Sequence, residues 1–498
     1  MNLLPIAEIA EIAGIAAKYV EPYGKYKAKI DSAIYDEVKN KEEGKLVLVT
    51  SITPTKAGEG KTTTAIALAE GMGRINQKAM LCLREPSLGP VFGLKGGATG
   101  GGKASIGPKD EINLHFTGDL HALTSSINLI AAVLDNSIYQ GNLLNIDPSR
   151  VVWTRALDMN DRVLRNITIG MGKFNGVERT DHFVITVASE LMAILCLAID
   201  SNDFHERVKK IIVAYTYDNA PITVGDLRVS HAVMKLMKEA LKPNLVQTVE
   251  HNPVFVHGGP FANIAHGCNS IIALKLAMKL APITLTEAGF GADLGAEKFL
   301  DITCKVGGFK PSGAVVVATV KALKMHGGVD YGDLQKENVE ALLKGVDNLK
   351  IHIENVKKYN IPIVVAINHF AFDTQAEIDA LTAWCKDEGY CVSFLDGFEK
   401  GGEGTIDLAQ KVVKMVNSDK GNYTSLYDIN SPIKDKISKI AKNIYGANGV
   451  IYKEKAEEQL KQYEEMGFSN AYVCIAKTPN SLSDDPKKLG VPKDFSIT

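Results

Sequence analysis

The sequence predicts an α/β protein with a P-loop-type parallel sheet domain and two smaller α/β domains. Short β-branched runs alternate with longer helical patterns along the chain. The runs are apolar throughout, which is typical of strands buried on both faces of a parallel sheet. A glycine-containing loop at residues 53–65, TPTKAGEGKTTTA, follows the first strong strand and precedes a helix, as a P-loop requires.

The expected elements follow from these patterns in chain order. Each strand candidate is a short run rich in β-branched residues. They are 45–50 (KLVLVT), 78–83 (KAMLCL), 211–216 (IIVAYT), 314–320 (AVVVATV), 361–368 (IPIVVAIN) and 472–477 (YVCIAK). Each helix candidate repeats apolar residues at helical spacing. They are 61–74, 231–241, 269–280, 348–359, 374–388 and 405–417.

The length of 498 residues exceeds one ordinary hydrophobic core. We expect a discontinuous large P-loop domain from residues 1–134 and approximately 250–345. Residues 135–249 form a second α/β domain and 346–498 a C-terminal one. The glycine-rich stretch 89–108 is a long loop of the kind that usually has a function.

Composition indicates a globular enzyme without a general affinity for nucleic acid or membranes. Lys and Arg number 56 against 58 Asp and Glu, a net charge of -2. The longest apolar run, 191–199, is far shorter than the roughly 20 residues that span a bilayer. The N-terminus has Glu8 and Glu11 within an apolar pattern and predicts an amphipathic helix, not a signal peptide. Seven cysteines without a C-x-x-C pair favour reduced, buried thiols in a cytoplasmic protein.

The loop at residues 55–63 predicts a phosphate cradle. Glycines let backbone amides approach a ligand, and the N-terminus of the next helix adds partial positive charge. Lys61 would reach the β- and γ-phosphates and Thr62 would ligate Mg²⁺. The alternative is a plain turn before a helix. The late strand ends in NHFA (368–371) and lacks the acid that reads guanine, so ATP is expected. The ATP-binding candidates are Thr55, Lys56, Ala57, Gly58, Glu59, Gly60, Lys61, Thr62 and Thr63.

Arg84 ends the second strand, in the sequence REPSLGP (84–90). In a β-α-β unit that strand end opens beside the P-loop, so Arg84 would stand near the γ-phosphate. Its planar guanidinium suits a carboxylate or phosphoryl group, and the alternative is a strand-end ion pair with Glu85 or another acid. A carboxylate beside ATP suggests activation by phosphoryl transfer to an acyl phosphate.

Several blocks together resemble the formate–tetrahydrofolate ligase family, although the chain is shorter at its C-terminus than the family pattern. The resemblance implies ATP-dependent ligation of formate to tetrahydrofolate through formyl phosphate, Mg²⁺ with ATP, a monovalent cation (K⁺ or NH₄⁺) and a homotetramer. The blocks that carry it are TKAGEGKTTT (55–64), REPSLGPVFGLKGG (84–97), EINLHFTGD (111–119), DMNDRVLRNI (158–167), VASELMAILCLA (187–198), PNLVQTVEHNPVFVHGGPFANIAHGCNS (243–270), TEAGFGADLGAEKF (286–299), VVVATVKALKMHGG (315–328), VVAINHF (364–370), KGGEG (400–404) and SLSDDP (481–486).

The resemblance also implies roles for single residues. Lys61, Arg84, Glu85 and Asp119 would be catalytic, and Arg84 with Phe290 would hold formate and formyl phosphate. Phe370 and Phe398, from the C-terminal domain, would stack on the pterin ring. The chain departs from the family pattern at Phe398 (Trp in the family), Lys103 (Tyr) and Lys56 (Pro).

Two other functions fit parts of the sequence. Lys56 and Lys61 match the two-lysine P-loop of partitioning-type switch ATPases, and a short, inactive ligase homologue is the other alternative. His257, His266 and Cys268 fit no recognised zinc spacing.

Overall fold

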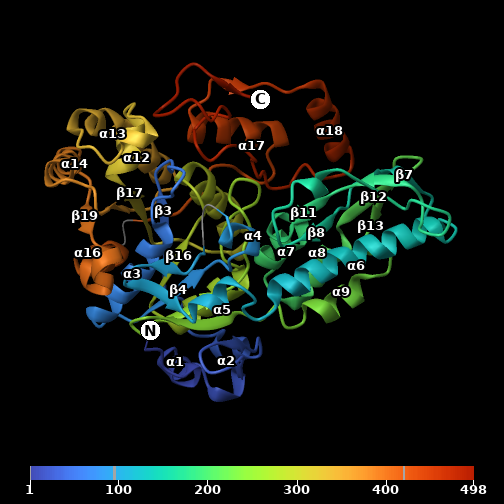
Figure 1. Cartoon of the computed structure of the whole chain (residues 1–498), viewed down its shortest axis with the longest axis horizontal. Coiled ribbons are helices and arrows are strands. Elements are labelled where there is room, and N and C mark those ends of the chain that lie inside the picture. The colour runs from blue at the N-terminus through green and yellow to red at the C-terminus, as the bar shows by residue number, and fades with distance from the viewer. Residues whose placement is uncertain (1, 94–96, 419–420) are drawn as a thin grey trace.

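A large, mostly parallel sheet forms the centre of the computed structural model, which describes residues 2–93, 97–418 and 421–498 and confirms the α/β class (Figure 1). From β15 to β19 every neighbouring pair is parallel, whereas β1, β2 and β14 are antiparallel. The strand order is β1 (Val20–Pro22), β2 (Ala28–Ile30), β14 (Asn244–Thr248), β15 (Pro253–Val256), β4 (Ala79–Leu83), β16 (Ile283–Glu287), β3 (Lys45–Ser51), β17 (Gly313–Ala318), β18 (Ile363–Asn368) and β19 (Val392–Leu395).

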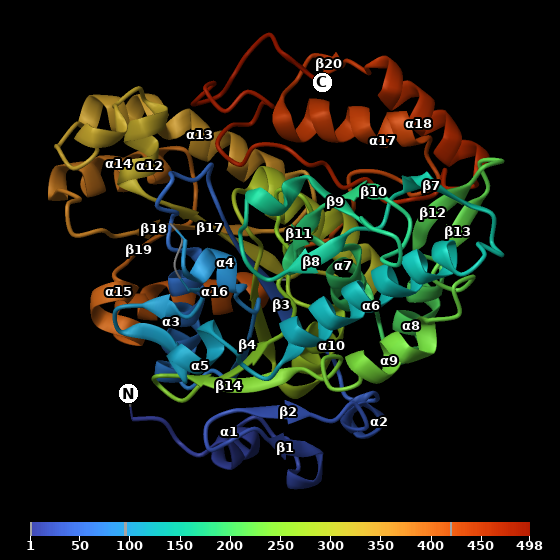
Figure 2. The ribbon, with the colours of Figure 1, turned by 45° about the vertical axis from the view of Figure 1, so that its right-hand side comes forward.

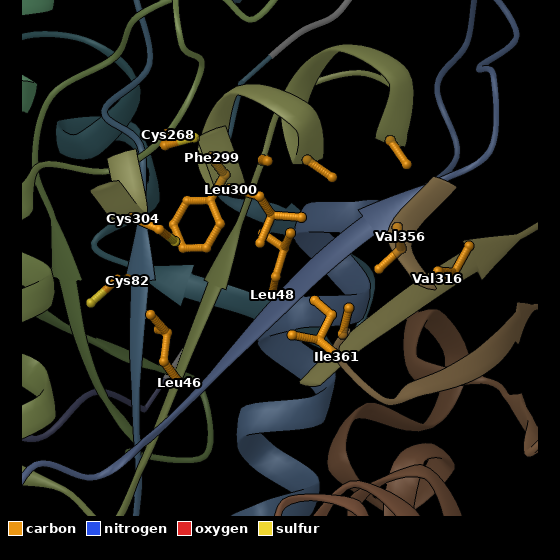
Figure 3. Packing of buried hydrophobic residues seen from close by; sticks show 14 of the residues in the cluster. Leu46, Leu48, Cys82, Cys268, Phe299, Leu300, Cys304, Val316, Val356 and Ile361 are labelled. Carbon is orange, nitrogen blue, oxygen red and sulfur yellow. The ribbon is translucent and has the colours of Figure 1, made fainter. Parts of the chain in front are cut away.

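Helices cover both faces of this sheet, and alternate residues of β3 point to opposite faces. Leu46 and Leu48 pack in one core with Phe299 and Cys304, as Figure 3 shows, and this core includes α10 (Ile271–Leu280), α13 (Val339–Lys357) and α14 (Gln375–Asp387). Val47 and Val49 pack in the other core, with α3 (Lys61–Arg74) and α16 (Ile406–Val416). Shorter helices border the sheet: α1 (Ile6–Ile12), α2 (Ile34–Val38), α4 (Leu88–Val91), α5 (Lys109–Asn113), α11 (Cys304–Gly307), α12 (Val320–His326) and α15 (Gly397–Lys400).

The elements formed by residues 120–241 lie beside the large sheet, as Figure 2 shows. Their buried side chains, from Leu120 to Leu241, form a separate hydrophobic core. Its small antiparallel sheet joins β13, β12 and β7. The elements are α6 (Asp119–Tyr139), β7 (Ile146–Val151), α7 (Glu190–Leu197), α8 (Ser201–Lys209), β12 (Ile212–Thr216), β13 (Pro221–Thr223) and α9 (Ser230–Met237), with β8 (Arg155–Leu157), β9 (Ile167–Ile169), β10 (Arg179–Asp181) and β11 (Phe183–Ile185) forming two short ladders.

The C-terminal part packs against the core that contains Leu46. Its buried residues include Tyr427, Ile433 and Phe495. The elements are α17 (Ile433–Ile440), α18 (Glu454–Glu465) and the short parallel pair β20 (Gly449–Val450) and β21 (Ser496–Ile497).

Most of the predicted elements are confirmed, with two corrections. The prediction of a strand at 472–477 is wrong: the segment has no sheet partner, and its Lys477 N–H donates to Asn263 O at 3.2 Å. The strand expected at 211–216 exists as β12, but it belongs to the small antiparallel sheet. The division at 134, 249 and 345 stays a prediction, and the large sheet includes β14, β18 and β19 from outside 1–134 and 250–345.

Candidate active site

The P-loop is the turn between β3 and α3. Gly58 and Gly60 have φ of 77° and 72°, a left-handed conformation that favours glycine. A Cβ on Gly60 would lie 2.4 Å from Asn368 Nδ2, so the loop also needs glycine for close packing. Buried Glu59 accepts hydrogen bonds from the Thr55 N–H at 2.6 Å and from the Thr319 hydroxyl. The loop conformation is therefore held by Glu59, which bonds both within the loop and to Thr319 after β17.

Lys61 lies at the first position of α3, where the helix N-terminus favours anions. Its Nζ donates to Ser51 Oγ at 3.1 Å. Burial lowers the pKa of Lys61 to about 8, although the negative charges of Glu287 and Glu59 act in the opposite direction. The ammonium group has therefore lost water without gaining a close carboxylate, which suits an anionic ligand.

Glu287 is a site residue that the sequence reasoning missed. It ends β16, which lies between β3 and β4 in the sheet. Its carboxylate accepts a hydrogen bond from Thr62 Oγ1 at 2.8 Å and lies 3.5 Å from a guanidinium nitrogen of Arg84. The hydroxyl of Thr62 and the carboxylate of Glu287 are oxygen donors of the kind that Mg²⁺ prefers.

Arg84 follows β4 and faces the P-loop across Glu287. Its Nη1 donates to Pro260 O at 3.3 Å, and its buried Nε has no hydrogen-bond partner among the described residues. An unpartnered buried donor of a charged group is costly unless a ligand completes it. Of the two roles left open for Arg84, the ion pair forms with Glu287 and not with Glu85.

Asp158 fixes the turn that follows Arg84. Its two carboxylate oxygens accept from Ser87 Oγ at 2.5 Å and from the Leu88 N–H at 3.1 Å. Asp158 belongs to the DMND stretch next to the small antiparallel sheet. That part of the molecule therefore helps to place the Arg84 turn.

Phe290 is joined to Lys61 through one hydroxyl group. Ser51 Oγ, which accepts from Lys61, lies 3.3 Å from the carbonyl oxygen of Phe290 and donates to it. Phe290 has a φ of 58°, and a bulky residue in this conformation costs about 1–3 kcal/mol. Such strain is common at ligand sites. The structure thus brings Lys61, Thr62, Arg84 and Phe290 together.

Asp119 and Glu85 lie in a buried polar cluster. The Asp119 carboxylate binds Lys29 Nζ at 2.7 Å and accepts from Asn244 Nδ2 at 2.7 Å. Burial, and then the negative charge of Asp119, raise the pKa of Glu85 well above its usual range. Burial therefore favours the neutral form of Glu85, and Asp119 is engaged by protein groups.

Phe370 and Phe398 follow the neighbouring strands β18 and β19, at the same sheet edge as the P-loop. The Phe370 ring lies beside Gly60, and Lys321 Nζ stands 3.8 Å from its centroid, so a cation occupies one face. Phe398 is 50% exposed and packs on Gly101. Its carbonyl oxygen accepts from the Lys103 N–H at 2.8 Å.

The remaining predicted residues lie around the loop. Lys56 and Ala57 are exposed, and Lys56 Nζ lies 5.9 Å from the Tyr331 ring centroid. Thr63 is half-buried.

His257 is hydrogen-bonded to Ser270 Oγ at 2.6 Å.

No helix in the described ranges has the length and apolar character needed to cross a membrane.

A comparison with known families identifies the family of the chain. A family model described as formate–tetrahydrofolate ligase matches residues 1–498, which is the whole of the sequence. The P-loop strand, Lys61, Arg84 and the TEAGF turn that contains Glu287 and Phe290 all lie within the match. The chain belongs to the formate–tetrahydrofolate ligase family, a family of ligases.

Proposed function

We propose that the chain joins formate to tetrahydrofolate with ATP, giving 10-formyltetrahydrofolate, ADP and phosphate. Formate oxygen would attack the γ-phosphorus of ATP, which releases ADP and gives formyl phosphate. The N10 amine of the folate would then attack the formyl carbon and expel phosphate. Family membership supports the overall reaction, and the observation that carries the mechanism is Arg84, whose buried Nε has no hydrogen-bond partner within the described part of the chain.

The charge and shape of each side chain suit it to a different role in this reaction. The P-loop amides and Lys61 would hold the phosphates, while Arg84 would orient formate and later bind formyl phosphate. Fixed cations at these points stabilise the charge that moves during phosphoryl transfer. Phe370 and Phe398 would stack on the pterin ring.

Two ions and an assembly complete the proposal. Thr62 and Glu287 would hold Mg²⁺, which would neutralise phosphate charge when bound. A monovalent cation, K⁺ or NH₄⁺, is a further requirement, and replacement by Li⁺ tests it.

We also propose a cytoplasmic homotetramer. The resemblance to the family supports this assembly, and sedimentation analysis measures it.

The decisive experiment is an assay of the folate product with each substrate omitted in turn. We expect ATP turnover only when formate and tetrahydrofolate are both present, with equal amounts of ADP and 10-formyltetrahydrofolate. ATP hydrolysis that ignores both substrates but rises with DNA or lipid would support the switch ATPase. ATP binding without any product would support an inactive homologue.

A further inference from the structure

Two neighbouring carboxyl groups, one buried and one partly exposed, lie under the P-loop helix, away from the phosphate cradle. Glu70 on α3 is fully buried, and neither of its carboxyl oxygens has a hydrogen-bond partner of normal geometry in the described chain. It faces Glu250, in the turn after β14. Glu250 accepts from Arg74 at 2.8 and 3.0 Å and from the Gly402 N–H at 3.1 Å. Glu70 thus has no function in the proposed mechanism, yet it is costly to bury.

Two glycines place the segment 397–405 directly on this pair. A Cβ on Gly401 would lie 3.0 Å from Glu250 Oε1 and 3.5 Å from Glu70 Oε2. A Cβ on Gly402 would lie 2.9 Å from Glu250 Oε2 and 2.8 Å from Glu70 Cβ. A side chain at position 402 would push the segment away from α3, because its Cβ would also lie 2.8 Å from the backbone carbonyl carbon of Glu70.

The same segment contains Phe398, one of the two rings proposed to hold the pterin. Besides the glycine contacts, Thr405 Oγ1 donates to Ala67 O on α3 at 2.6 Å. On its other side, the Phe398 carbonyl oxygen accepts from the Lys103 N–H at 2.8 Å. The position of Phe398 therefore depends on how closely the segment packs against Glu70 and Glu250.

The charges around Glu70 do not neutralise a second carboxylate. On its own helix, Arg74 is already engaged by both oxygens of Glu250. Glu403 on the segment and Lys103 on the opposite turn have exposed side chains. Burial, and then the Glu250 charge, raise the pKa of Glu70 to about 8, while Thr248 and the Glu250 backbone act in the opposite direction. Glu70 is therefore a neutral acid at pH 7, beside the carboxylate of Glu250.

We propose that Glu70 is a positioning residue for folate binding: its neutral carboxylic acid lets the segment 397–405, with Phe398, pack closely against α3 beside Glu250. Loss of its proton places two negative charges side by side and displaces the segment. The folate site then opens, while the phosphate cradle at the other end of α3 keeps its geometry. This inference rests on the proposed function, because it assigns Phe398 to the folate.

The first test is the KM for tetrahydrofolate between pH 6.5 and 9.5, at saturating ATP, in three proteins. The wild-type KM should rise at least fivefold from pH 7 to pH 9. Glu70→Gln, which mimics the neutral acid, should flatten this rise. Glu403→Gln, which removes a carboxylate from the same segment without touching the pair, should follow the wild type. A flat wild-type profile, or an equal rise in Glu70→Gln, would overturn the inference.

A second test does not depend on activity. Phe398→Trp places a fluorescent reporter on the segment, and the emission of Trp153 and Trp384 is subtracted with the Phe398 protein. The reporter should show a transition near pH 8 that disappears when Glu70→Gln is added. With Glu250→Gln instead, the transition should also be lost, since deprotonation of Glu70 then meets no second negative charge.

The outcomes separate this inference from the proposed function. A protein that makes no 10-formyltetrahydrofolate but shows a reporter transition that requires Glu70 contradicts the proposed function. The role of Glu70 in positioning the segment 397–405 would still hold. Product formation with a reporter that ignores pH contradicts the inference alone. A transition that Ca²⁺ abolishes in proportion to bound metal also overturns it, because the pair would then bind a cation and not a proton.

Discussion

The buried ion pair of Lys29 and Asp119 offers a test of what Asp119 does. The resemblance assigns Asp119 to catalysis, whereas its carboxylate is bound by Lys29 and Asn244 in the structure. The perturbation is Lys29→Met, which keeps the length of the side chain and removes its charge. If Asp119 supports the scaffold, the loss should appear first in stability.

The magnitude follows from the geometry of the pair. The charges are 2.7 Å apart, and the two side chains are 0% and 2% exposed. At an effective dielectric constant of about 20, their attraction is about 6 kcal/mol. Desolvation of both ions offsets part of it, and removing one partner of a buried pair typically costs about 3–5 kcal/mol. We therefore expect Lys29→Met to lower the free energy of unfolding by about 4 kcal/mol.

The assay is urea unfolding followed by circular dichroism, with ligase activity measured on the same samples. Lys29→Met combined with Asp119→Asn should recover more than half of the loss, because the uncompensated charge is gone. Lys39→Met, which breaks an exposed pair with Asp36, is the control and should cost less than about 0.5 kcal/mol. A cost below about 1 kcal/mol for Lys29→Met would refute the reasoning. If the Asp119→Asn protein is inactive but has unchanged stability, Asp119 has a catalytic function.

Three further predictions concern the substrate groups. Arg84→Ser should abolish synthesis of 10-formyltetrahydrofolate while ATP binding, measured by calorimetry, persists; near-normal synthesis would remove Arg84 from the mechanism. The charged form of Lys61, whose pKa is lowered to about 8, is present below that pH and is lost as the pH rises through it. ATP affinity of the free enzyme should therefore fall about tenfold per pH unit above pH 8, and a constant affinity to pH 9.5 would contradict this. Phe398→Ala should raise the KM for tetrahydrofolate about two- to tenfold, from a stacking contribution of about 0.5–1.5 kcal/mol, with the KM for ATP unchanged; an equal rise in both would indicate general damage.

Local signals predicted the strand, the loop and the helix around residues 55–63 well. The strand at 45–50 and the helix at 61–74 both exist, because an apolar β-branched run and a glycine-to-helix junction are features of neighbouring residues. The prediction that Arg84 stands near the P-loop also agrees with the structure, although β16 lies between the two strands.

What the sequence did not show depends on distant partners. β16 (ITLTE) alternates threonine with apolar residues and was not recognised as a buried strand, yet Thr286 is buried with its hydroxyl bonded to Cys82 O at 3.2 Å. Glu287 was missed together with that strand. Asp119 and Lys29 are 90 residues apart in the sequence, and no local pattern predicts that they pair. The run at 472–477 has strand propensity, but no neighbouring strand is available to it.

The position of β3 between β16 and β17 also has a consequence for how the protein is made. Both neighbours of this strand are encoded more than 200 residues after it, and Thr62 meets Glu287 across 225 positions. During synthesis β3 therefore leaves the ribosome with two unpaired apolar edges. More than half of the chain must be synthesised before β3 can pair with both of its neighbouring strands. Such non-local pairing slows folding and exposes the strand to aggregation. The strand that carries the phosphate cradle is thus the part of the sheet that depends most on protection while the chain is being made.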